Sequence, residues 1–240
     1  MENNEHLRGK YHEMAYSFEK DTQKKLFAYF LLFTGLLIFI LSLLGIFNEF
    51  SKWINNFLID NLGYTNRWSK TFGPKWFLYT MTEISALGGK VMLFIGSVLV
   101  VIYYNLKNKH ILLWKFLFVF VGGNFVLLAL KYIFAKDVPY EPFDFLISDV
   151  TPFPSGHAMM SLIYYLTIAV FLTRKQRRKK VRNFTLISAS VIVFIICISR
   201  VLRGSHTVIE VLGGFSAGLI WLCLCWLAER YLRIHYKWDF

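Results

Sequence analysis

The chain of 240 residues is 56% hydrophobic and 18% aromatic, with a mean hydropathy of +0.46. This composition excludes an ordinary soluble domain and predicts a single membrane domain. The net charge of +12 would suggest a nucleic-acid partner in a soluble protein, but the basic residues cluster between apolar stretches, so membrane topology explains them better and no nucleic acid is expected.

Six apolar stretches approach or reach the roughly 20 helical residues needed to cross a bilayer. They are Leu26–Phe47, Gly89–Leu106, Ile111–Leu130, His157–Thr173, Phe184–Val201 and Thr207–Ala228. Residues 1–25 are polar and lack a cleavage pattern, so the first stretch is expected to stay as an anchor. The chain is therefore predicted to be an all-α, six-helix transmembrane bundle at 26–228, flanked by cytoplasmic tails at 1–25 and 229–240.

Two shorter helices are predicted between the first and second spans. Ser51–Leu62 places its apolar side chains on one helical face, which favours a helix lying in the membrane interface. Phe77–Leu87 is a second short apolar helix, and Gly88 and Gly89 are expected to end it. Glu83 within it could orient a phosphate or act structurally, and the structural role is favoured.

The positions of lysine and arginine between the spans predict how the chain is oriented in the membrane. The basic segments are Lys20, Lys24 and Lys25; Lys107 and Lys109; Arg174, Lys175, Arg177, Arg178, Lys179, Lys180 and Arg182; and Arg230, Arg233 and Lys237. With six spans, all four segments fall on one side, which the positive-inside rule makes cytoplasmic. Both termini are then cytoplasmic, and polar residues at the ends of the third to sixth spans share one depth on the non-cytoplasmic face.

Two segments on that face contain the candidate catalytic and phosphate-binding residues. Ser155 is placed as a helix N-cap, Gly156 permits close backbone approach, and the helix N-terminus suits a phosphate. His157 points into the same space. The alternative is that Pro154-Ser155-Gly156 only starts a helix and His157 is satisfied by water.

The second segment contains Arg200, His206 and Glu210. His206 and Glu210 are four residues apart, so they share one helical face, where a carboxylate can orient a histidine nucleophile. The planar guanidinium group of Arg200 can donate two hydrogen bonds to the oxygens of a phosphate. The alternative is an ion pair between Arg200 and Glu210 that ties two helix ends together. Charges at a membrane edge are costly to insert, which favours the functional interpretation.

These motifs, PSGH at 154–157 and SRxxxxxHxxxE at 199–210 preceded by Lys131 and Pro139, resemble the type 2 phosphatidic acid phosphatase superfamily of membrane lipid phosphatases. The resemblance implies phosphate binding by Lys131, Ser155, Gly156 and Arg200. It implies that His157 is the general acid, His206 is the nucleophile that forms a phosphohistidine, and Glu210 orients His206. It implies no metal and no cofactor; Cys197, Cys223 and Cys225 lie in apolar runs that indicate neither a disulfide nor a zinc site.

The chain departs from the family pattern at two positions. Val138 stands where the first motif, KxxxxxxRP, has arginine, and the loss of one charge-assisted hydrogen bond corresponds to about 1.5–3 kcal/mol. Lys136 or Arg203 could compensate, although Lys136 is better explained as a solvated loop residue. Glu210 replaces an aspartate, but keeps the carboxylate on a stem one methylene longer.

The expected function is an integral membrane phosphatase acting on a phosphate monoester or pyrophosphate of a lipid. Polyprenyl pyrophosphate, phosphatidylglycerol phosphate and phosphatidic acid all fit, and a bacterial plasma membrane is the expected location. A catalytically degenerate member that binds or moves phospholipid headgroups without hydrolysis is the alternative, motivated by Val138. A transporter is disfavoured because the polar groups gather at one membrane edge.

Overall fold

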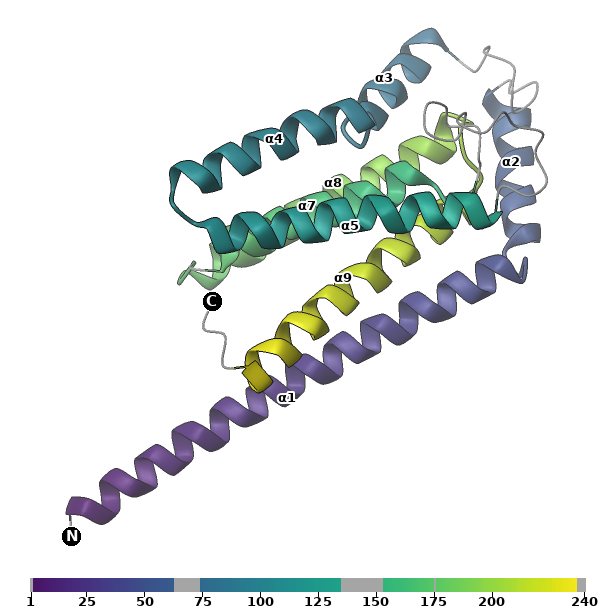
Figure 1. Ribbon diagram of the computed structural model, residues 1–240. Coiled ribbons are helices and arrows are strands. Elements are labelled where there is room, and N and C mark those ends of the chain that lie inside the picture. The colour runs from purple at the N-terminus through teal and green to yellow at the C-terminus, as the bar shows by residue number, and fades with distance from the viewer. Residues whose placement is uncertain (1, 63–73, 135–152, 175, 237–240) are drawn as a thin grey trace.

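The computed structural model describes residues 2–62, 74–134, 153–174 and 176–236, and all regular structure within these ranges is helical. The helices are α1 (Glu2–Leu43), α2 (Asn48–Leu62), α3 (Lys75–Ala86), α4 (Lys90–Leu106), α5 (His110–Phe134), α7 (Gly156–Thr173), α8 (Lys179–Leu202) and α9 (Val208–Tyr236). Figure 1 shows α4, α5, α7 and α8 running alongside one another, while α9 crosses toward α1, whose N-terminal half extends beyond the bundle.

Six helical segments are long and apolar enough to cross a membrane. They are Thr22–Leu43, Lys75–Leu106, His110–Phe134, Gly156–Thr173, Lys179–Leu202 and Val208–Arg233. Each overlaps one predicted stretch, so the predicted all-α bundle of six spans is confirmed. The first span ends at Leu43 rather than Phe47, because Gly45 adopts a φ of +71° that turns the chain out of the helix.

The two short helices predicted between the first spans are present as α2 and α3. Figure 1 shows α2 standing across one end of the bundle, at a steep angle to the spans. Its exposed side carries Phe50, Trp53 and Phe57, whose rings stack at centroid distances of 6.1 and 6.0 Å. Helix α3 continues into α4 after a turn at 87–89, and the two together form the second candidate span.

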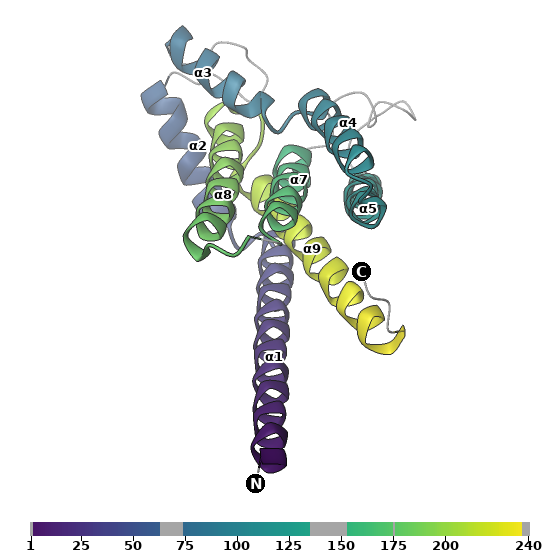
Figure 2. The same ribbon diagram turned by 90° about the vertical axis from the view of Figure 1, so that its left-hand side faces the viewer.

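Helix α7 is the centre of the bundle. Within the six candidate spans its window is 56% buried, whereas the other five range from 17% to 44%. Met159 and Ile163 are fully buried and pack with Phe116 of α5, and Figure 2 shows α7 between α8, α9 and α5. The residues at the N-terminus of α7 are therefore surrounded by other helix ends rather than by lipid.

Small residues let α9 approach α7 closely. A Cβ atom added at Gly214 would lie 2.3 Å from the carbonyl oxygen of Ser155, and one at Gly218 would lie 3.0 Å from that of Met159. Gly214 and Gly218 form a GxxxG pattern, which permits close contact between transmembrane helices. This approach sets the position of the α9 N-terminus against that of α7.

Candidate active site

Four helix ends meet at the end of the bundle that faces α2. These are the C-terminal ends of α5 and α8 and the N-terminal ends of α7 and α9 (Figure 1). All seven predicted site residues lie at these ends. Five of them have less than 7% of their surface exposed: Lys131, Ser155, Arg200, His206 and Glu210. Buried polar side chains of this kind require polar partners or a ligand.

The connection between α8 and α9 folds back on the end of α8. Gly204 has a φ of +70°, and the backbone N–H groups of Ser205 and His206 both donate to the carbonyl oxygen of Arg200 at 3.2 Å. These two bonds anchor the loop that carries His206 to Arg200, which is itself only 2% exposed.

His206 and Glu210 form a buried pair. Nδ1 of His206 lies 2.8 Å from Oε2 of Glu210, and the same oxygen accepts a 3.1 Å hydrogen bond from the backbone N–H of Thr207. A carboxylate can only accept, so Nδ1 carries the hydrogen and Nε2 of the neutral ring holds the lone pair. The longer glutamate side chain thus reaches the histidine at normal hydrogen-bond distance, with the geometry needed to orient a nucleophile.

Ser155 joins α7 to this pair. Its backbone N–H donates to the carbonyl oxygen of Glu210 at 2.9 Å, while its own carbonyl accepts from Met159 at 3.1 Å. Ser155 occupies the N-cap position of α7, as predicted, but its hydroxyl makes no capping bond. The prediction that its side chain caps the helix is therefore wrong: the fully buried Oγ has no hydrogen-bond partner among the described residues.

Lys131 is brought to the same helix start. A Cβ atom added at Gly156 would lie 3.8 Å from Cε of Lys131 and 3.2 Å from Cδ2 of Leu127, both on α5. Lys131 is only 5% exposed, so its ammonium group is held in the protein at the α7 N-terminus. His157 follows in the first turn of α7 and is half-buried. The structure thus connects all seven predicted residues through α7 and the α8–α9 loop.

Sequence reasoning missed Ser85. This residue of α3 is 1% exposed, and its Oγ accepts a 2.9 Å hydrogen bond from Nη1 of Arg200. The sequence signal for Ser85 was weak, because α3 also carries Thr80, Thr82 and Glu83, and Glu83 is exposed. The turn after α3 also lies against the site. A Cβ atom added at Gly88 in this turn would lie 3.6 Å from the carbonyl oxygen of His157.

A hollow of about 340 Å³ opens beside Glu210. Its wall includes Asn48, Ser51 and Lys52 from α2, together with Phe153, Thr207 and Ile209. The contribution of α2 was also not foreseen. Val138, Pro139 and Lys136 lie outside the described residues. Arg203 is the C-cap residue of α8 and is half-buried.

Comparison with known proteins identifies the family to which the chain belongs. The family model of the PAP2 superfamily matches residues 112–234, which include every helix end of the site. The chain belongs to the PAP2 superfamily, a family of membrane phosphatases, and is a multi-pass membrane protein. The family recognised from the sequence motifs is thereby confirmed.

Two relatives illustrate the likeness. Phosphatidylglycerophosphatase B of Bacillus subtilis (strain 168) is 45% identical over 69 residues, which are 28% of this chain and 34% of that protein. The aligned part thus spans about a third of that curated relative. The crystal structure of a transmembrane PAP2-type phosphatidylglycerolphosphate phosphatase from Bacillus subtilis matches with a TM-score of 0.61 and 24% identity, covering 85% of this chain and 96% of the other. The second likeness supports the fold.

Proposed function

We propose that this protein is an integral membrane lipid phosphatase that works through a phosphohistidine on His206. The observation that carries the proposal is the buried contact of 2.8 Å between Nδ1 of His206 and Oε2 of Glu210. A histidine oriented in this way has its Nε2 lone pair available as a nucleophile, and the carboxylate stabilises the positive charge that the ring gains on phosphorylation.

The phosphate would be held by groups of three kinds around the α7 N-terminus. The first backbone N–H groups of α7 and its dipole favour an anion, and the unpartnered hydroxyl of Ser155 can donate to a phosphate oxygen. Lys131 and Arg200 supply two positive charges from α5 and α8. Gly156 lets these groups approach the helix start.

In the first step, Nε2 of His206 attacks phosphorus and a P–N bond forms as the P–O bond to the lipid breaks. His157 donates a proton to the departing oxygen, so the lipid leaves as an alcohol or as a monophosphate. In the second step, the now neutral His157 accepts a proton from a water molecule that attacks the phosphohistidine. The P–N bond breaks, inorganic phosphate leaves, and both histidines return to their starting states.

The substrate is a phosphate monoester or pyrophosphate on a lipid. Polyprenyl pyrophosphate, phosphatidylglycerol phosphate and phosphatidic acid all present the required group, and the named relatives make phosphatidylglycerol phosphate the first to test. The proposed setting is a bacterial plasma membrane, with both termini cytoplasmic and the site on the other face, because the four basic segments share one side.

The test is phosphate release from these three lipids by the purified protein, with and without a chelator. We expect chelator-insensitive turnover, abolished in His206→Ala and preserved in His110→Ala, whose histidine is exposed at the start of α5. Equal activity of the two variants would refute the assignment, and turnover that stops on chelation would refute its metal-independent form.

A second candidate rests on Val138. If the missing motif arginine abolishes turnover, the same anion site would bind or move phospholipid headgroups without hydrolysis. Headgroup binding that depends on Lys131, with no phosphate release from any of the three lipids, would favour this candidate.

A further inference from the structure

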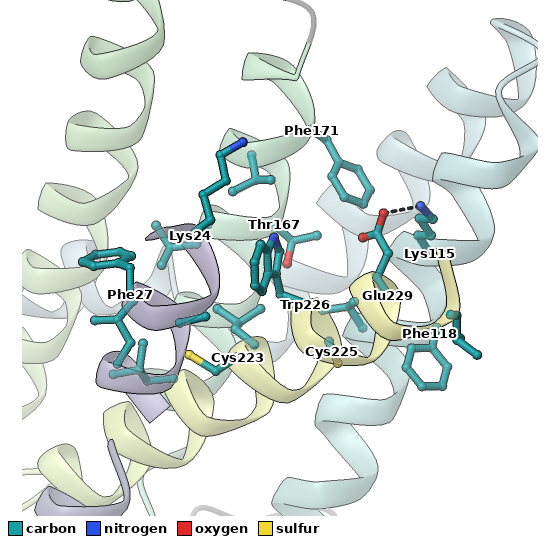
Figure 3. A pocket seen from close by; sticks show the side chains of 18 of the residues that line it. Lys24, Phe27, Lys115, Phe118, Thr167, Phe171, Cys223, Cys225, Trp226 and Glu229 are labelled. Carbon is teal, nitrogen blue, oxygen red and sulfur yellow. Dashed lines mark hydrogen bonds and ion pairs between the residues drawn. The ribbon is translucent and has the colours of Figure 1, made fainter. Parts of the chain in front are cut away.

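A second hollow lies at the opposite end of the helices. This groove of about 1020 Å³ is formed by α1, α5, α7 and α9, and Figure 3 shows its lining. Lys115 on α5 and Glu229 on α9 line it, and they lie 16 residues from Lys131 and 19 residues from Glu210. At 1.5 Å per residue these separations are about 24 and 28 Å, close to the thickness of a bilayer core. The groove is therefore distinct from the phosphatase site.

Most of the groove wall is aliphatic or aromatic. Phe27, Phe118, Val170 and Phe171 come from three different helices. Figure 3 shows Phe27, Phe118 and Phe171 on different sides of Trp226. A wall of this kind suits an acyl chain, which gains dispersion contacts and requires no hydrogen bonds.

One edge of the groove carries a compact basic cluster. Oε1 of Glu229 accepts three contacts: from Lys115 at 2.6 Å, from Arg233 at 2.8 Å and from Arg174 at 3.4 Å. These four side chains carry three positive charges and one negative charge, a net charge of +2, and each is 17–33% exposed. Lys24 adds a further positive charge across the groove (Figure 3). Basic pockets between transmembrane helices are suited to anionic lipid headgroups.

A polar residue lies deeper in the groove. Thr167 lines it and is 6% exposed, and its Oγ1 has no hydrogen-bond partner within the described part of the chain. Thr167 on α7 precedes Arg174, the C-cap residue of that helix, by seven residues, about 10 Å along the helix axis.

We propose that the groove binds one anionic phospholipid. Its phosphate contacts Lys115, Arg174 and Arg233, and an acyl chain lies along the apolar wall past Thr167, in the leaflet opposite to the phosphatase site. This lipid is a bound partner and not a substrate, so the inference is independent of the proposed hydrolysis.

Native mass spectrometry of the full-length protein tests the proposal by titration with phosphatidylserine or phosphatidylcholine of identical acyl chains. Arg174→Gln/Arg233→Gln removes two cluster charges, and Arg177→Gln/Arg178→Gln removes two charges from the exposed loop nearby. Val170→Trp narrows the groove, and Val191→Trp is its control, because both valines are 49% exposed but Val191 is on α8, outside the groove. Lys131→Ala reports on lipid at the phosphatase site.

We expect phosphatidylserine to bind about 30-fold more weakly to Arg174→Gln/Arg233→Gln, which corresponds to about 2 kcal/mol. Val170→Trp should also weaken binding, whereas both controls and Lys131→Ala should retain it. Equal losses of phosphatidylserine binding in variants and controls would show that the bound lipid is ordinary bulk lipid. Phosphatidylcholine binding as tight as phosphatidylserine binding would show that the groove does not select an anionic headgroup. Loss only in Lys131→Ala would place the lipid at the other site, and a lipid-free dimer that Val170→Trp dissociates would identify a second copy as the occupant. Each of these four results would overturn the proposal.

Discussion

The hydroxyl of Ser85 on α3 accepts a 2.9 Å hydrogen bond from the guanidinium of Arg200 on α8. The carbonyl oxygen of Arg200 in turn accepts the backbone N–H of His206 at 3.2 Å. Arg200 is thus held at its side chain by α3 and at its backbone by the loop that carries the proposed nucleophile. The short helix α3, which begins the second candidate span, therefore has a direct part in positioning the site.

Replacing Ser85 with alanine should weaken the phosphatase without unfolding it. A hydrogen bond to a charged group contributes about 1.5–3 kcal/mol, so kcat/KM is expected to fall about 10–150-fold. Steady-state kinetics with phosphatidylglycerol phosphate measures the change. Ser97→Ala is the control, because Ser97 is also buried but donates to the carbonyl oxygen of Leu93 in its own helix. Similar losses in both variants would contradict a specific role for Ser85.

Glu210→Gln keeps the size of the side chain but removes its charge. The imidazole then loses the carboxylate that orients it and stabilises its positive charge, and kcat is expected to fall on the order of 10³-fold. Glu210→Asp restores the aspartate of the family motif and should retain more activity, with a loss of at most about 100-fold from the shorter reach.

Trapping of labelled phosphohistidine checks this prediction, because the intermediate should form slowly in Glu210→Gln. Glu83→Gln is the control, since Glu83 is an exposed carboxylate on α3. Unchanged phosphohistidine formation in Glu210→Gln would show that Glu210 does not act through His206.

Gly214→Ala should disturb the junction of α7 and α9. The added Cβ would lie 2.3 Å from the carbonyl oxygen of Ser155, and backbone on both sides must move to relieve the overlap. We expect a loss of about 1–3 kcal/mol in the free energy of unfolding and a larger loss of activity, because Ser155 moves with α7.

Thermal unfolding in detergent, measured beside Gly35→Ala, tests this expectation. A Cβ atom at Gly35 would lie 3.1 Å from Cγ1 of Ile220, a side-chain atom that can rotate away. Equal unfolding temperatures for both variants would show that the α7–α9 junction does not depend on the close backbone approach at Gly214.

Val138→Arg restores the first motif of the family. One added charge-assisted hydrogen bond to phosphate should raise kcat/KM about 10–150-fold. Val138→Leu is the matched control for bulk without charge. A rise in both variants, or in neither despite measurable turnover, would show that position 138 does not contact the phosphate.

The sequence by itself determined the number of spans, the helical class and the identity of the seven motif residues that gather at the site. Spans follow from apolar length, because a backbone in lipid must satisfy its own hydrogen bonds. Successive spans cross the membrane in opposite directions, so the end of Ile111–Leu130 and the start of His157–Thr173 must share a depth. The motif residues were therefore predictable as a group from one-dimensional information.

Only the tertiary structure decided the contacts between helices distant along the chain. Ser85 and Arg200 are 115 residues apart, and no local pattern pairs a serine on one helix with an arginine on another. The hydroxyl of Ser155 lacks its expected capping bond, and the basic cluster around Glu229 forms only because α5, α7 and α9 converge there. These features depend on how helices pack in three dimensions, which side-chain shape and close backbone approach determine and apolar periodicity does not.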